Sequence, residues 1–480
     1  MRFLLSRLQE KARTSLWVVP SIAAVMALVL ARMLPAFERT LHLEKHAWYL
    51  FAGEPDSARE LLSTIASSMM TFTALVFSIT ILVLQLASSQ FSPRVLRTFL
   101  EDGATRGAIA TFVGTFVYAM ALLPEVHSEG AVGGRVLPAL SVYVAFALVL
   151  VSVAVFIHYI HRMAHSIRSV HVVRRVAQDG AACIEELYPE GATEEPEGAE
   201  GAPRDEPTQM VHHGDEGGVL AAVDDERLLA LATEHGAIIE LVPQPGDFVV
   251  RRSPLLRVWS THEIDEEALR RAVAIEPERT PHQDPAFALR QLVDIAERAL
   301  SPGTNDPTTA VQAIDRITDL MSALATRAFP SPNRLDADGQ LRLILPRPNW
   351  EDLVRLAFDE IRQYGQGSIQ VLRRLRAALE GLAALCSTSR RAVVLAELAE
   401  LDRLARELPP FDRALARRPS AQGQGAARRG RARSVRDGHG GARLDPERAQ
   451  QSARRIEGDD HARRSALVRG HDVPAFTRRA

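Results

Sequence analysis

Four long apolar stretches lie in the first third of the chain. They are Leu16–Leu34, Leu62–Ala87, Gly107–Leu123 and Leu137–Ile160. A helix crosses a bilayer with about 20 apolar residues, so each stretch is long enough to span it. The first stretch is not a signal peptide, because no small-residue cleavage site follows it and three more spans do. The pattern predicts a transmembrane domain of four helices over residues 16–160.

Polar residues in the second stretch share one helical face. Ser67, Thr71, Ala74, Ser78 and Gln85 are separated by 4, 3, 4 and 7 positions, which places them within about 60° of one another. We call Ser67, Thr71, Ser78 and Gln85 the polar stripe. One interpretation is that the stripe lines a pore. The other is close packing, because small and polar residues let membrane helices approach and form hydrogen bonds.

Acidic residues are missing from the four stretches as bounded above. Proton-coupled pumps and many cation carriers keep a carboxylate inside the membrane. Such a pump is therefore disfavoured, whereas a passive pore, a sensor or a scaffold fits this composition.

Basic residues flanking the spans indicate how the chain is oriented. Eleven lie on the side of the N-terminus, and four lie on the other side, or five if Arg32 extends outward. The positive-inside rule then places both termini in the cytoplasm. We expect a multi-pass protein of the cell inner membrane, with residues 1–15 as a cytoplasmic N-terminus.

The pattern changes after the fourth span. Residues 161–189 continue that span as a juxtamembrane helix, and the Glu-, Gly- and Pro-rich residues 190–216 predict an acidic disordered linker. Residues 217–410 predict a cytoplasmic α+β domain that is mostly helical. The expected fold class is thus a membrane α-helical protein, with four transmembrane helices and this cytoplasmic domain.

Local signals place elements within that domain. Three short strands are expected at Val219–Val223, Ala237–Val242 and Phe248–Val250. The pattern is helical from Asp284 onward. Asp284 and Asp306 each precede a proline, an arrangement typical of helix N-caps, and Asn349 caps another helix. The oxygens around Asp306 also suggest a phosphate or metal site, but a capping carboxylate would repel an anion.

Three histidines follow the fourth span on one helical face. His158, His161 and His165 lie at positions i, i+3 and i+7. Histidines so spaced can bind a metal or sense pH. No acidic or cysteine partner is near in sequence, so an interfacial or packed helix is the preferred interpretation. We therefore predict no metal site and no cofactor, with the histidines as the alternative.

Lysine and cysteine usage excludes several kinds of chemistry. Lys11 and Lys45 are the only lysines, so a Walker P-loop is excluded and Schiff-base catalysis is disfavoured. Two cysteines, Cys183 and Cys386, cannot form a cysteine-based zinc cluster or a disulfide framework. No hydrolase or dinucleotide motif occurs either. We expect that the protein is not an enzyme.

The C-terminal residues 411–480 differ from the rest in charge. They contain 17 Arg, no Lys and 8 acidic residues, a net charge of +9. Since the whole chain carries −2, residues 1–410 carry −11. The stretch has no apolar periodicity and predicts an Arg-rich disordered tail. It lacks interleaved aromatic residues, so we expect no specific nucleic-acid partner.

Several short motifs occur in a fixed order along the chain. They are Leu84–Arg94 (LQLASSQFSPR), Phe99–Asp102, Pro245–Val249, Glu278–Thr280, Gln283–Pro285, Ala299–Gly303 and Asn305–Pro307. With these motifs the chain resembles, over about residues 10–410, a bacterial family of multi-pass "predicted membrane proteins" with a domain of unknown function. The resemblance implies an integral inner-membrane protein with a cytoplasmic C-terminal domain. It supplies no activity, substrate or catalytic residue.

Two functions remain open at this stage. The first is an oligomeric pore or channel-like protein, lined by the polar stripe, with Ser92 and Arg94 at its inner mouth and a cytoplasmic domain as its gate. The alternative is a membrane-anchored sensor or scaffold that binds a cytoplasmic protein. In both, the lipid bilayer and further copies of the chain are the expected partners.

Overall fold

The structure, a computed structural model, describes residues 17–40, 55–90, 94, 103–126, 139–166, 168–191, 203, 205–280 and 283–407. The predicted cytoplasmic N-terminus, Ser92 and the Arg-rich tail lie outside these described residues. So do residues 192–202, the middle of the predicted linker.

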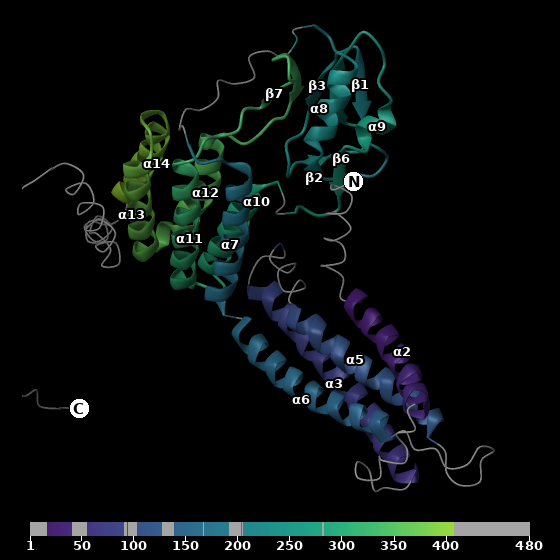
Figure 1. Ribbon diagram of the computed structural model, residues 1–480. Coiled ribbons are helices and arrows are strands. Elements are labelled where there is room, and N and C mark those ends of the chain that lie inside the picture. Colours follow the sequence, from purple (N-terminus) through teal and green to yellow (C-terminus); the bar gives the residue numbers. More distant parts are fainter. Residues whose placement is uncertain are drawn as a thin grey trace, which may run out of the picture. The chain divides into compact units, whose positions relative to one another are not determined.

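Four long apolar helices form the first part of the described chain, which we call the membrane bundle (Figure 1). They are α2 (Val18–Thr40), α3 (Pro55–Gln90), α5 (Gly103–Leu122, continued by the short η4, Leu123–Glu125) and α6 (Ala139–Ser166). Each is long and apolar enough to cross a membrane, as the sequence predicts. Helix α5 packs against the other three.

One face of α3 fills the interior of the membrane bundle. Leu62, Met69, Val76 and Val83 repeat every seven residues, and each is at most 4% exposed. We call them the buried heptad. Tyr159 of α6 lies against them, and its hydroxyl donates to the Val76 carbonyl at 3.2 Å. The interior is therefore closed by side-chain packing rather than open along its axis.

A buried carboxylate lies near the end of the first membrane helix, beyond the predicted stretch that ends at Leu34. Helix α2 continues past Leu34 to Thr40 and includes Glu38, which is 4% exposed. The backbone N–H and the hydroxyl of Ser141 both donate to Glu38 Oε1 at 2.6 Å. Because Glu38 satisfies a free donor at the start of α6, burial of this acid is tolerated. The predicted stretch Leu16–Leu34 contains no acidic residue, and Glu38 lies beyond it, in the part of α2 that extends past Leu34.

Six helices form a second group, the C-terminal helical bundle (Figure 1). They are α7 (Ser169–Leu187), α10 (Pro285–Leu300), α11 (Pro307–Ala325), α12 (Trp350–Tyr364), α13 (Ile369–Leu385) and α14 (Thr388–Glu407). Helices α7, α11 and α12 all pack against α10, so α10 is central. Arg168 has an extended backbone before α7. The predicted continuation of the fourth span is thus a separate helix.

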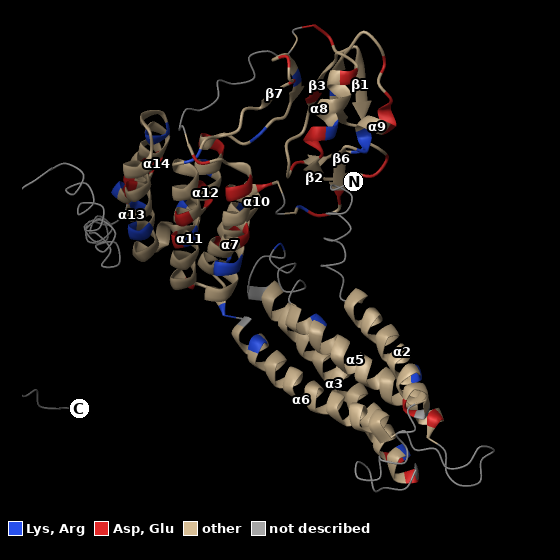
Figure 2. Ribbon diagram, in the orientation of Figure 1, with Lys and Arg blue, Asp and Glu red and all other residues tan. Residues whose placement is uncertain are grey.

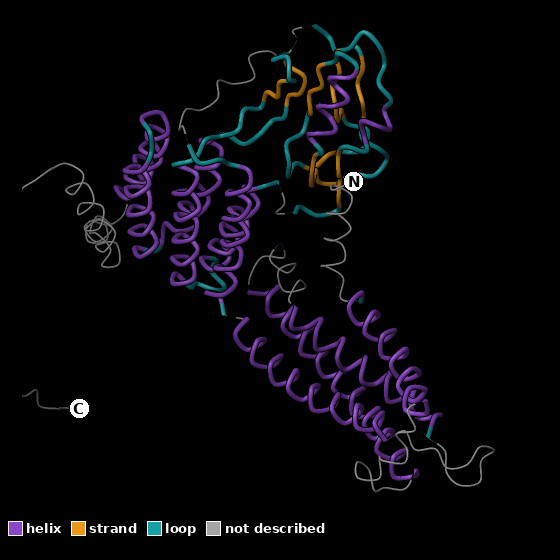
Figure 3. Tube along the Cα trace, in the orientation of Figure 1, coloured by secondary structure: helices purple, strands orange, loops and turns teal. Residues whose placement is uncertain are grey.

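The remaining elements form a sheet unit with ten members (Figure 3). They are β1 (Gln209–His212), β2 (Gly218–Val223), α8 (Asp225–Glu234), β3 (Ile238–Leu241), β4 (Phe248–Val249), β5 (Pro254–Trp259), α9 (Glu266–Arg270), β6 (Val273–Glu276), β7 (Asn333–Leu335) and β8 (Leu341–Ile344). One sheet has the order β1-β5-β3-β8-β7 and the other has β4-β2-β6. Only β3 and β8 pair in parallel among the strands described.

Two sequence expectations fail in the sheet unit. Strand β1 lies within residues 190–216, predicted to be disordered, because fully buried Val211 and the ladder with β5 hold it in the sheet. Strands β7 and β8 interrupt the stretch predicted to be helical from Asp284 onward. They form because β8 pairs with β3, which lies about a hundred residues earlier in the chain.

Each of the three groups has its own hydrophobic core. Charged residues occur mostly outside the membrane bundle (Figure 2). Ala87, in the last turns of α3, is 3% exposed and belongs to the core of the C-terminal helical bundle. The end of the second membrane helix is therefore built into that bundle.

Candidate functional site

The polar stripe of α3 faces away from the other described helices of the membrane bundle. All four of its side chains are exposed. Ser67, Thr71 and Ser78 donate their hydroxyls to carbonyls in the preceding turn, at 3.0, 3.1 and 2.9 Å. Such bonds satisfy a hydroxyl in an apolar environment without a partner helix.

The buried heptad occupies the other side of α3. Packing within one chain is therefore carried out by Leu62, Met69, Val76 and Val83, and not by the stripe. If the stripe serves close helix packing, the helices that it packs must therefore belong to two different copies of the chain. Whether the stripe lines a pore stays a prediction.

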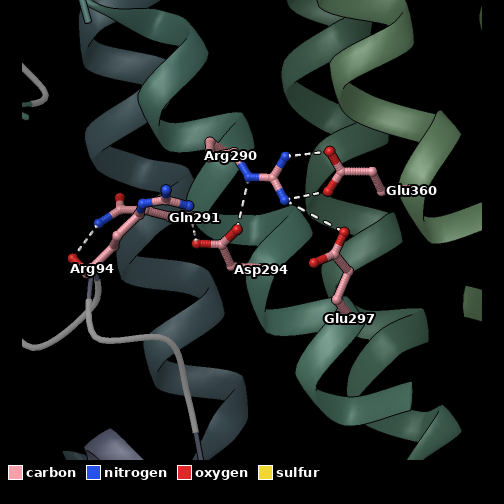
Figure 4. A network of polar contacts seen from close by, with 6 residues as sticks. All are labelled: Arg94, Arg290, Gln291, Asp294, Glu297 and Glu360. Carbon is pink, nitrogen blue, oxygen red and sulfur yellow. Dashed lines mark hydrogen bonds and ion pairs between the residues drawn. The ribbon is translucent and has the colours of Figure 1, made fainter. Parts of the chain in front are cut away.

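Arg94 connects the segment after α3 to the C-terminal helical bundle (Figure 4). Its guanidinium forms an ion pair with Asp294 of α10 at 2.7 Å. The Gln291 side-chain amide, one turn earlier, donates to the Arg94 carbonyl at 2.8 Å. Side chain and backbone are thus both held by α10. The predicted role of Arg94 at an inner mouth stays a prediction.

Arg290 extends this contact across the bundle (Figure 4). It donates to Asp294 Oδ1 at 2.7 Å and to Glu360 of α12 at 2.6 Å, with a second, short bond to the same carboxylate. Glu297 Oε1 lies 3.4 Å from the same guanidinium. We call Arg94, Arg290, Asp294, Glu297 and Glu360 the membrane-proximal network. Asp294 is its bridge, because it pairs with both arginines.

The carboxyl groups of the network differ in their affinity for protons. Burial raises the pKa of Glu297 to about 7, and its hydrogen bond and charge repulsion with Glu360 add to the effect. The hydrogen bonds from Arg290 lower the pKa of Glu360 to about 2. Glu297 therefore changes charge near neutral pH, and Glu360 stays ionised. With Glu297 protonated, the two arginines of the network balance its two remaining carboxylates.

The three predicted helix caps have structural partners. Asp284 accepts from the Phe287 N–H at 3.1 Å and also binds Arg279. Asp306 accepts from the backbone of Thr308 and of Thr309 at 3.0 and 3.2 Å. Asn349 forms a reciprocal capping box with the residue three positions on. Each side chain begins the helix that follows it.

Two of the three histidines at the end of α6 lie against each other, with their rings tilted by 42°. The His161 and His165 rings have centroids 4.4 Å apart, and His165 Nδ1 lies 2.8 Å from the His161 carbonyl. In the part of the chain that the structure describes, no three His, Cys, Asp or Glu side chains are grouped to hold a metal ion. The histidine alternative thus gains no support.

The membrane-proximal network was not predicted from the sequence. Its members on α10 lie at positions i, i+4 and i+7 of a mostly apolar helix, a local signal that could have been noticed. Arg94 lies 200 residues from its partner Asp294, and Glu360 lies 70 residues from its partner Arg290, so only the fold shows that these pairs meet.

Comparison with known proteins agrees with the membrane bundle. A family model described as "Predicted membrane protein (DUF2254)" matches residues 13–381. The uncharacterized protein Mb1321c of Mycobacterium bovis is 35% identical over 405 residues, covering 82% of this chain and 76% of the relative. The uncharacterized protein Rv1290c of Mycobacterium tuberculosis matches with the same identity and coverage. No solved structure matches the chain.

Proposed function

The chain belongs to this family of predicted membrane proteins, and we propose that it is an oligomeric, channel-like protein of the cell inner membrane. The conducting path lies between copies and is lined by the polar stripe of α3. Both termini lie in the cytoplasm, where the sheet unit and the C-terminal helical bundle gate the path. We assign the protein no enzymatic activity and no cofactor.

The outward position of the polar stripe is the observation that carries this proposal. A path through the middle of one membrane bundle would have to displace the buried heptad. The four polar side chains of the stripe instead lie together on the exposed face of α3, whereas Thr73 and Thr80 of the same helix are buried. When copies meet through this face, hydroxyl and amide groups surround the space between them, and lipid is excluded from it.

The membrane-proximal network supports a gating role for the C-terminal helical bundle. Arg94 follows the pore-lining helix after a few residues and is bound to α10 by its side chain and its carbonyl. Arg290 joins α10 to α12 through Glu360. A shift of α10 therefore pulls on the end of α3.

Single-channel recording from purified protein in planar bilayers tests the proposal. We expect discrete currents from the wild type. Ser78→Leu and Gln85→Leu narrow the path and make it apolar, so each should reduce the conductance at least threefold. The reason is that an apolar constriction of small radius favours dewetting over conduction.

The matched control is Ala154→Leu, which adds similar bulk to an exposed position of α6 away from the stripe. It should leave the conductance unchanged. Silence of the wild type across several salts and both voltage signs would contradict the proposal. That result would favour the anchored sensor or scaffold, and the next step would be a search for its cytoplasmic protein partner.

A further inference from the structure

A cavity of about 280 Å³ lies where the sheet unit meets the ends of two helices of the C-terminal helical bundle. The end of α7, the start of α10 and the segment after β8 line it together with β2 and β3. Gln283 joins its walls, because this side chain accepts from the Val223 N–H at 2.8 Å and donates to the Val223 carbonyl at 3.1 Å. The cavity is about as large as the smaller ligand sites of proteins.

Most charges on the cavity wall are already neutralised. Arg334 pairs with Asp225 at 2.9 Å. Asp284 is 3% exposed, caps α10 and binds Arg279. Glu186 is exposed to solvent. Asp225 and Asp284 are thus paired, and Glu186 is a lining carboxylate that solvent screens.

Arg347 is the exception among the arginines that line the cavity. Its guanidinium makes no hydrogen bond or ion pair with any residue that the structure describes, although it lines the cavity. Burial lowers the pKa of this guanidinium, and Asp225 and Tyr188 offset that effect only from beyond ion-pair distance. Arg347 is half-buried. A partly desolvated cation that has no ion pair among the described residues would stabilise an anion entering the cavity.

The rest of the wall is rigid and largely apolar. Five prolines line it, namely Pro245, Pro285, Pro330, Pro346 and Pro348. Proline fixes the backbone and offers no N–H donor. Leu241 and Leu345 add aliphatic surface, and Tyr188 is held by an edge-on contact with Phe329, with ring centroids 5.0 Å apart. Such a wall suits a compact apolar or aromatic body.

We propose that this cavity binds a small organic anion, a carboxylate or a phosphate monoester, whose charged group pairs with Arg347 and whose apolar body lies against the proline-rich wall. This site is independent of the proposed channel. The ligand needs both a negatively charged group and an apolar body. Inorganic phosphate lacks the apolar body, and a neutral aromatic molecule lacks the charge, so neither should bind well.

Calorimetric titration of the purified full-length chain in detergent tests this assignment. Benzoate and phenyl phosphate are the probes, and inorganic phosphate and benzyl alcohol each lack one of the two features. We expect at least one organic anion to bind at least tenfold more tightly than both comparison molecules. Comparing benzoate with phenyl phosphate then distinguishes the carboxylate from the phosphate class. Equal binding of inorganic phosphate would overturn the assignment, and so would no binding of either probe.

Arg347→Gln should weaken binding of the preferred probe at least tenfold. The control is Arg316→Gln, which removes a positive charge from the exposed side of α11. It should leave binding of the probe unchanged. The ligand-free melting temperature supplies a second measurement. Because Arg347 has no ion pair or hydrogen bond among the described residues, Arg347→Gln should leave that temperature unchanged or raise it. A clear fall would mean that the guanidinium holds the fold together, and this outcome would overturn the proposal, as would unchanged binding.

Discussion

The pKa of Glu297 depends on the fact that Arg290 binds Glu360 more closely than it binds Glu297. Glu360 accepts two bonds from that guanidinium, whereas Glu297 lies at 3.4 Å from it. Glu297 is also only 19% exposed, so its ionised form loses solvation without gaining a close cation. The geometry of one arginine therefore separates the pKa values of two neighbouring carboxyl groups.

This separation predicts how stability depends on pH. The pKa of Glu297 is about 7 in the fold, above the ordinary value of 4.5. Between these values the folded state binds more protons than the unfolded state, so the free energy of unfolding falls as pH rises from about 4.5 to 7. We expect a loss of about 2 kcal/mol from this group, which is less than its full shift because Glu360 is coupled to it. Thermal unfolding in detergent at pH 5 and pH 7.5 measures the loss.

Glu297→Gln should remove that part of the pH dependence. Glu397 also has a pKa raised to about 7 by burial, so the relevant quantity is the difference between wild type and variant. Glu267→Gln on the exposed side of α9 serves as the control and should keep the wild-type slope. A Glu297→Gln profile parallel to the wild type would contradict the assignment.

At the level of elements, helix starts could be predicted from the sequence and most strands could not. Asp306 acts within three residues of its own position, so a short motif contains all the information needed. Strand β8 has four residues and exists because it pairs with β3 from a distant part of the chain. Short strands of this kind depend on tertiary pairing more than on propensity.

The contribution of the Asp306 cap to the free energy of unfolding can be measured. Asp306→Ala leaves two N–H groups of α11 without their acceptor, so we expect a loss of about 1 kcal/mol in the free energy of unfolding. Asp306→Asn can still accept and should lose less. Asp319→Ala, an exposed position of the same helix, is the control for loss of charge. Equal melting temperatures for Asp306→Ala and the control would show that water replaces the cap without cost.

For the whole molecule, the sequence predicts the membrane bundle well and the sites poorly. The four spans follow from apolar runs, which are local. The burial of Glu38 depends instead on Ser141, about 100 residues later. The cavity around Arg347 is bounded by segments spread over more than 150 residues. Such sites are assembled by the fold, so periodicity and spacing cannot reveal them.

The length of α3 has a mechanical consequence. From Leu61 to Ala87 the helix has 27 residues without a charge, a length of about 40 Å, whereas the hydrocarbon layer is about 30 Å thick. The helix must tilt to keep this stretch in lipid, and a thicker bilayer lets it stand more upright. Each change of tilt displaces the end of α3 at Gln90, four residues before Arg94, which is attached to α10.

For the channel proposed above, this attachment predicts that gating depends on membrane thickness. In bilayers of one headgroup type, we expect the fraction of time spent open to change steadily as the acyl chains lengthen from about 14 to 22 carbons. Arg94→Gln should flatten this response, because it loosens the attachment at the moving end. An open fraction that is constant over the whole series would show that tilt and gating are uncoupled.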